Sequence, residues 1–168
     1  MTHTRMDRSQ KILIVDDEAA VLRAITMVFE HAGFEVVTAR NPEEALDRWR
    51  CERGEIQVVL ADLELNSSIT GEQLCEFIHF EAPELLTIVL TAYPVDGRRL
   101  GRIDGVNFFQ KPFDIHALVA AVGEFLQLPS GASPALQTSQ GGVRGVTGHR
   151  RRTDGPRASL DLMLSVSR

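Results

Sequence analysis

The chain contains little cysteine and no long apolar stretch. Its 168 residues include only two cysteines, Cys51 and Cys75, without CxxC spacing, and its five histidines show no metal-ligand spacing. A disulfide framework and a zinc site are therefore disfavoured. No apolar run approaches the length of a membrane-spanning helix, and the first residues, MTHTRMDRSQK, lack the hydrophobic region of a signal peptide. We expect a reduced, cytoplasmic protein without a membrane span.

Charge is distributed unevenly along the chain. Residues 1–127 carry 12 Lys or Arg against 21 Asp or Glu, a net charge of −9, whereas residues 128–168 carry six Arg against two Asp, a net charge of +4. Gly, Ser, Pro and Arg dominate the second segment, so we expect a disordered tail over 128–168. The HRRRT run (149–153) in this segment could contact nucleic acid or a membrane through phosphate groups, but we favour a solvated tail. The role of LDLMLSV (160–166) stays open.

Apolar periodicity predicts five strands alternating with helices before residue 128. The expected strands are 12–15, 34–39, 56–62, 85–92 and 106–110, and the expected helices are 17–32, 42–53, 72–80 and 114–126. Several of the strands are apolar throughout, which is typical of a parallel sheet covered on both faces. Right-handed crossovers then give a doubly wound α/β fold. Between residues 93 and 105, one proline and three glycines predict a short or irregular helix at most.

Polar residues follow four of these strands. Asp16 and Asp17 end the first strand, Asp62 the third, Thr91 the fourth, and Lys111 the fifth. Because ligands bind outside the carboxyl ends of strands in an open parallel sheet, the five residues are expected to converge on one edge. Three neighbouring carboxylates repel unless a cation lies among them, and hard oxygen ligands suit Mg²⁺. Thr91 and Lys111 would then suit an anionic group that arrives at the metal.

Four segments, in this order, carry a family resemblance: ILIVDDE, VVLADLEL, IVLTAY and FFQKPF. Over residues 10–127 the chain resembles a response-regulator receiver domain of two-component signalling. The resemblance implies a flavodoxin-like (βα)5 fold, a five-stranded parallel sheet in the order 2-1-3-4-5. It implies a domain that accepts a phosphoryl group from a histidine kinase or a phosphotransfer protein and catalyses no reaction other than its own phosphorylation and dephosphorylation.

The resemblance also implies roles for particular residues. Asp62 would be the phosphoacceptor, Thr91 and Lys111 would bind phosphoryl oxygens, and Thr91 and Phe108 would form the conformational switch. The implied Mg²⁺ ligands are Asp16 through water, Asp17, Asp62 and the backbone carbonyl of Glu64.

The chain departs from the family pattern in three places. Leu65-Asn66 replaces the usual Met-Pro, and Gly71 comes about one residue late, so we expect a different loop shape. The segment from Thr91 to Lys111 is about two residues short, which puts the usual output surface in doubt. Glu64 and Tyr93 stand at positions that vary in the family and tune the lifetime of the acyl phosphate.

Three readings of function remain at this point. The first is a phosphoacceptor that contacts a downstream protein, without a DNA-binding or other output domain in 128–168 and with a homodimer left open. The second is a receiver-like scaffold that acts independently of phosphate. A distant third is an aspartate-based phosphatase, although such enzymes place the nucleophile on the first strand. For each of the three aspartates taken alone, the alternative to a metal-binding role is a solvated acid that caps the next helix.

Overall fold

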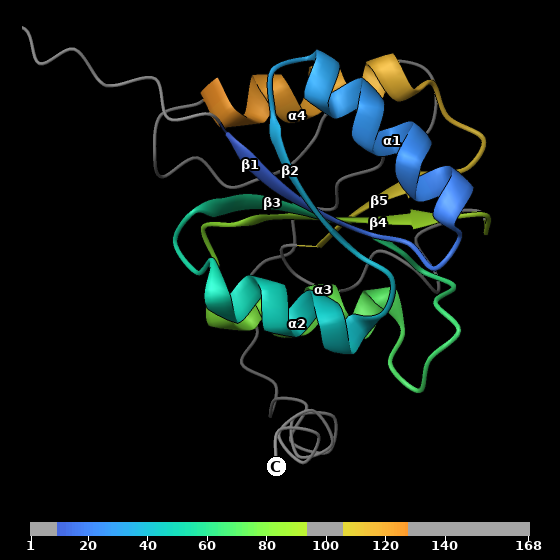
Figure 1. Ribbon diagram of the computed structural model, residues 1–168, viewed down its shortest axis with the longest axis vertical. Coiled ribbons are helices and arrows are strands. Elements are labelled where there is room, and N and C mark those ends of the chain that lie inside the picture. The colour runs from blue at the N-terminus through green and yellow to red at the C-terminus, as the bar shows by residue number, and fades with distance from the viewer. Residues whose placement is uncertain (1–9, 94–105, 128–168) are drawn as a thin grey trace, which may run out of the picture.

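Strands and helices alternate through the computed structural model (Figure 1), which describes residues 10–93 and 106–127. The strands are β1 (Lys11–Val15), β2 (Glu35–Ala39), β3 (Ile56–Asp62), β4 (Leu86–Thr91) and β5 (Val106–Gln110). The helices are α1 (Ala19–His31), α2 (Pro42–Cys51), α3 (Gly71–Glu81) and α4 (Ile115–Gln127). The irregular helix expected over 93–105 and the tail 128–168 lie outside the described residues, apart from Tyr93.

The five strands form one parallel sheet in the order β2-β1-β3-β4-β5. Helices α1 and α4 cover one face, and α2 and α3 cover the other, as Figure 1 shows above and below the sheet. The fold class predicted from the sequence is thus confirmed. Since all strands run the same way, their carboxyl ends meet at one edge.

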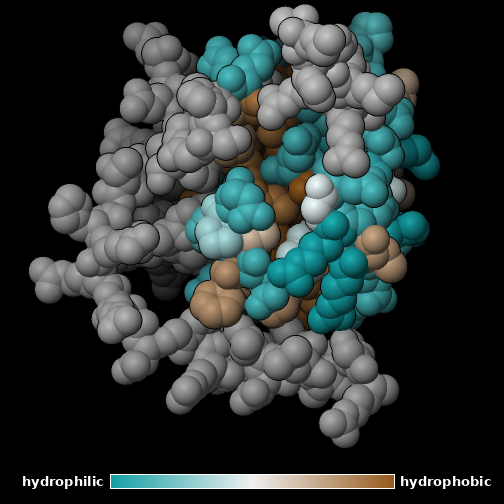
Figure 2. Space-filling view, turned by 90° about the vertical axis from the view of Figure 1, so that its left-hand side faces the viewer, coloured by the Kyte–Doolittle hydropathy of each residue, from teal (hydrophilic) through white to brown (hydrophobic). Residues whose placement is uncertain are grey.

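Two apolar layers hold the helices to the sheet. Alternate residues of each strand point to opposite faces, so Phe108 joins the core beneath α2 and α3, while Phe109 joins the core beneath α1 and α4. Strands β1 and β4, on either side of the central strand β3, are buried along their whole length, as expected of strands with helices on both faces. Figure 2 shows apolar side chains, in brown, in the middle of one side of the molecule, with hydrophilic ones around them.

The ends of the helices follow local chemistry. The Asn41 side chain caps α2 by accepting a hydrogen bond from the Glu44 N–H, and Pro42 is the first helical residue, where the sequence predicted the start of this helix. Gly33, with φ of 93°, turns the chain after α1. Ala32 is exposed, because it lies in the turn that follows α1 and leads into β2.

A buried lysine ties the start of β1 to its surroundings. Nζ of Lys11 lies 2.9 Å from Glu35, 2.8 Å from Glu52 and 2.7 Å from Glu55. These carboxylates, Glu52 foremost, raise the pKa of the Lys11 ammonium above its ordinary range. Lys11 therefore stays charged, although it is largely buried.

Candidate functional site

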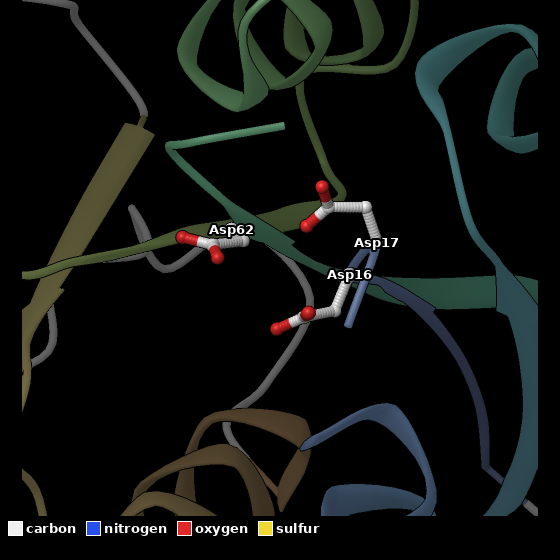
Figure 3. A group of neighbouring side chains, drawn as sticks. All are labelled: Asp16, Asp17 and Asp62. Atoms are coloured by element: carbon white, nitrogen blue, oxygen red, sulfur yellow. The ribbon is translucent and has the colours of Figure 1, made fainter. Parts of the chain in front are cut away.

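Three carboxylates meet at the carboxyl edge of the sheet. Asp16 and Asp17 follow β1, and Asp62 ends the neighbouring strand β3, which pairs with β1 up to Val15 and Ala61. Each aspartate offers an oxygen atom, and these atoms all lie within 4.8 Å of one another. The three side chains extend toward the same side of the sheet edge (Figure 3). The structure thus brings together the acids that the sequence placed on separate strands.

Asp16 is the most buried of the three acids, with only 1% of its surface exposed. Its Oδ1 accepts a hydrogen bond of 2.8 Å from the Glu18 N–H, whereas its buried Oδ2 has no hydrogen-bond partner among the described residues. Burial raises the pKa of Asp16, and the charge of Asp62 adds to this, against the Glu18 hydrogen bond. A buried, unpartnered carboxylate oxygen beside two more carboxylates fits a divalent cation with oxygen ligands, such as Mg²⁺.

Asp62 receives a donor on each of its two oxygens. Nζ of Lys111, which follows β5, lies 3.1 Å from Oδ2, and the backbone N–H of Glu64 donates to Oδ1 over 3.3 Å. The Asp62 side chain keeps 13% of its surface exposed and that of Lys111 keeps 29%. The Asp62 carboxylate is therefore partly open to solvent, beside a positive charge.

Thr91 and Phe108 lie on the two strands beyond β3. Thr91, buried at the end of β4, accepts a hydrogen bond of 3.0 Å at Oγ1 from the Tyr93 N–H. Its backbone carbonyl accepts one of 2.6 Å from the Lys111 N–H, which ties the two strand ends together. Phe108 in β5 is 1% exposed and packs in the core beneath α3.

Glu64 and Tyr93 meet at the rim of the site. The Glu64 carboxylate forms a hydrogen bond with the Tyr93 phenol, which raises the pKa of Tyr93. Both side chains are exposed. The two positions that the family resemblance singled out as variable are thus paired across the entrance to Asp62.

Asn66, in the loop between β3 and α3, and Gly71, the first residue of α3, contact the acids more closely than the sequence predicted. Asn66 donates to Oδ2 of Asp17 from its side-chain amide and, over 3.4 Å, from its backbone N–H. Gly71 lies so close to Asp62 that an added Cβ would stand 1.8 Å from the Asp62 carbonyl oxygen. From the sequence, these two departures from the family pattern were expected to affect the shape of the loop more than the acid cluster. The signal in the sequence for the first of these contacts was Asn66 itself, an amide four residues after Asp62.

The family model of the response regulator receiver domain matches residues 12–123. The chain belongs to this receiver family. Receivers are the modules of two-component response regulators that bind Mg²⁺ at an acidic pocket and interact with histidine kinases, and they are generally signalling modules rather than enzymes. None of the helices within 10–93 and 106–127 is both long and apolar enough to cross a membrane.

Similar proteins include whole receivers and larger regulators. Sporulation initiation phosphotransferase F of Bacillus subtilis (strain 168) is 30% identical over 127 residues, covering 73% of this chain and 98% of that protein. The probable transcriptional regulator ycf27 of Pyropia yezoensis is 30% identical over 142 residues, 82% of this chain but 56% of that protein. The chain therefore spans about half the length of that regulator. A receiver domain protein from Clostridium thermocellum, of known crystal structure, shares 27% identity at a TM-score of 0.63, covering 70% of this chain and 94% of that one.

The receiver is expected to become more stable when Asp16 is replaced by Asn. A raised pKa means that the folded chain binds this proton more tightly than the unfolded chain does, so ionised Asp16 lowers the free energy of unfolding. Asp16→Asn keeps the acceptor for the Glu18 N–H and removes a negative charge beside Asp17 and Asp62. We expect a gain of about 1 kcal/mol in urea denaturation without divalent cations.

Asp114→Asn provides the matched control for this prediction. Asp114 accepts the same type of hydrogen bond, 2.9 Å from the His116 N–H, but is exposed and outside the acid cluster. The free energy of unfolding of Asp114→Asn should equal that of the wild type. Mg²⁺ should raise the free energy of unfolding of this control, but should raise that of Asp16→Asn much less. A lower stability of Asp16→Asn in the absence of Mg²⁺ would contradict the prediction.

Proposed function

We propose that this receiver accepts a phosphoryl group on Asp62 from a histidine kinase or a phosphotransfer protein, in an Mg²⁺-dependent reaction. The observation that carries the proposal is the surroundings of Asp62: an ammonium 3.1 Å from one oxygen and two further carboxylates within 4.8 Å. The name of the phosphotransferase from Bacillus subtilis supports a role in phosphoryl transfer.

In the proposed reaction the Asp62 carboxylate is the nucleophile. One of its oxygens forms the new bond to phosphorus, and the bond from phosphorus to the donor's leaving atom breaks, with its electron pair going to the donor. Lys111 pairs with an oxygen of the phosphoryl group. The Thr91 hydroxyl hydrogen-bonds another, because Oγ1 uses a lone pair for the Tyr93 N–H and keeps its own hydrogen to donate.

Mg²⁺ would be held by Asp17 directly, by Asp16 through water, by Asp62 and by the backbone carbonyl of Glu64. When bound, the ion offsets the negative charge that gathers between the carboxylates and the incoming phosphoryl group. Burial of Asp16 with an unpartnered oxygen supports this assignment, since a water molecule on the cation would supply the missing partner.

The phosphorylated receiver would act by changing its contacts with a downstream protein. We assign the conformational switch to Thr91 and Phe108, where movement of Thr91 toward the phosphoryl group leaves space for the aromatic ring. The chain would work in the cytoplasm and catalyse only its own phosphorylation and dephosphorylation. Residues 10–127 would form the receiver.

Intact-mass analysis of the full chain with acetyl phosphate tests the proposed reaction. With Mg²⁺, we expect the mass of one added phosphoryl group; with EDTA in its place, we expect no adduct. If the small donor fails, a kinase-driven reaction is the second measurement. No adduct in either reaction would exclude phosphoacceptor function under these conditions and favour a scaffold that works without phosphate.

A further inference from the structure

We propose that Asn66 is a positioning residue for the cation site, which holds the Asp17 carboxylate where a divalent ion can bind it. The inference rests on the proposed function, because it concerns the same Mg²⁺ site. It adds a residue outside the expected ligand set. Asn66 contributes two donors, the side-chain amide and the backbone N–H, and both end on Oδ2 of Asp17. Because both donors use the same oxygen, Oδ1 of Asp17 stays available as a ligand.

The loop holds Asn66 firmly in this place. Leu65 and Ile69, on either side of it, are buried in the core with 7% and 3% of their surfaces exposed. Ser67 closes a tight turn, with its N–H 2.7 Å from the Leu65 carbonyl, and its hydroxyl donates to the Glu43 carboxylate over 3.3 Å. Asn66 is thus the residue that this anchored turn presents to the acids.

The Asp17 side chain needs such a restraint. Without a cation, the charges of Asp16 and Asp62 repel it, and it is less buried than Asp16, so solvent favours rotation away from the cluster. Two N–H groups on one oxygen oppose that rotation and orient the other oxygen. Hydrogen-bond partners of metal-ligating side chains typically change metal affinity by about 10–100-fold when they are removed.

Isothermal titration calorimetry of the full chain with Mg²⁺ tests the proposal. We expect Asn66→Ala, which keeps the backbone N–H and loses the amide, to bind Mg²⁺ roughly 10-fold more weakly than the wild type. Asn66→Gln keeps an amide donor and should recover most of the affinity. Ser67→Ala is the matched control, because it removes the hydrogen bonds of the hydroxyl with Glu43 and with the Ile69 N–H and leaves both donors of Asn66 in place. Its loss of Mg²⁺ affinity should be clearly smaller than that of Asn66→Ala, because the buried side chains of Leu65 and Ile69 still hold the loop.

Each other outcome would overturn the inference in a different way. Equal Mg²⁺ affinity of wild type and Asn66→Ala would show that Asn66 does not position Asp17, while the proposed function would stand. Tighter binding by Asn66→Ala would show that the amide competes with the cation. An equal loss in Ser67→Ala would assign the effect to loop anchoring. A wild type that binds no Mg²⁺ would overturn the proposed cation site itself, and the inference with it.

Discussion

The Asp62→Asn variant is expected to gain no phosphoryl group under conditions that modify the wild type fully. An amide does not act as a nucleophile toward phosphorus, so replacing one oxygen removes the proposed acceptor while keeping its shape. Asn can still accept the Glu64 N–H at Oδ1. The loss should therefore be chemical rather than structural, and intact-mass analysis at successive times after adding acetyl phosphate and Mg²⁺ measures it.

Asp47→Asn is a suitable control for charge and chemistry. Asp47 lies on α2, with 79% of its side chain exposed and only a weak pair with Arg50, so this variant should accept phosphate like the wild type. Urea denaturation should show that Asp62→Asn remains folded. An adduct on Asp62→Asn at the wild-type rate would place the acceptor on another residue, and peptide mapping would then distinguish Asp16 from Asp17.

The second large effect is expected for Gly71→Ala. The added methyl group would stand 1.8 Å from the carbonyl oxygen and 2.7 Å from the carbonyl carbon of Asp62, and both of these atoms belong to the backbone. Neither α3 nor β3 can yield easily, because Gly71 begins the helix and Asp62 ends a buried strand. We expect a loss of about 3 kcal/mol or slightly more in the free energy of unfolding, together with slower phosphorylation of the displaced Asp62.

Gly123→Ala separates this steric effect from the general cost of losing a glycine. Gly123 lies within α4, and nothing is within 4 Å of a Cβ placed on it. Because alanine is the better helix former, this variant should be more stable than the wild type by about 0.5–1 kcal/mol. Urea denaturation of both variants makes the comparison. Equal stability of Gly71→Ala and the wild type would mean that helix α3 can shift away from Asp62 at little cost.

The sequence predicted the fold well because its information is local and periodic. Strands β3 and β5 begin and end where the apolar runs do, and the Asn41 cap marks the start of α2. Phe108 and Phe109 show what the alternation of side chains along a strand does not predict. Alternation required one of them in the core, yet both are buried, because helices cover both faces of the sheet.

The candidate site was predictable only as far as topology determines it. Parallel strands place Asp16, Asp17 and Asp62 at one edge whatever their side chains do. The contacts of Asn66 and Gly71 depend on how the loop before α3 folds back, which burial of Leu65 and Ile69 decides. Such contacts join residues that are distant in sequence, and no local propensity predicts them. The roles of Glu64 and Tyr93 likewise follow from a pairing across the site.

The lysine network at the start of β1 has a consequence for how salt and cations should affect the molecule. The same strand has carboxylates gathered at both of its ends, but Lys11 contacts all three of those at the start, whereas at the other end Lys111 pairs with Asp62. Each carboxylate at the Lys11 end is therefore ion-paired within the chain, whatever the solution contains. At the Asp16 end the proposed Mg²⁺ would supply a further positive charge, so cation supply should alter that pole of the sheet more than the other.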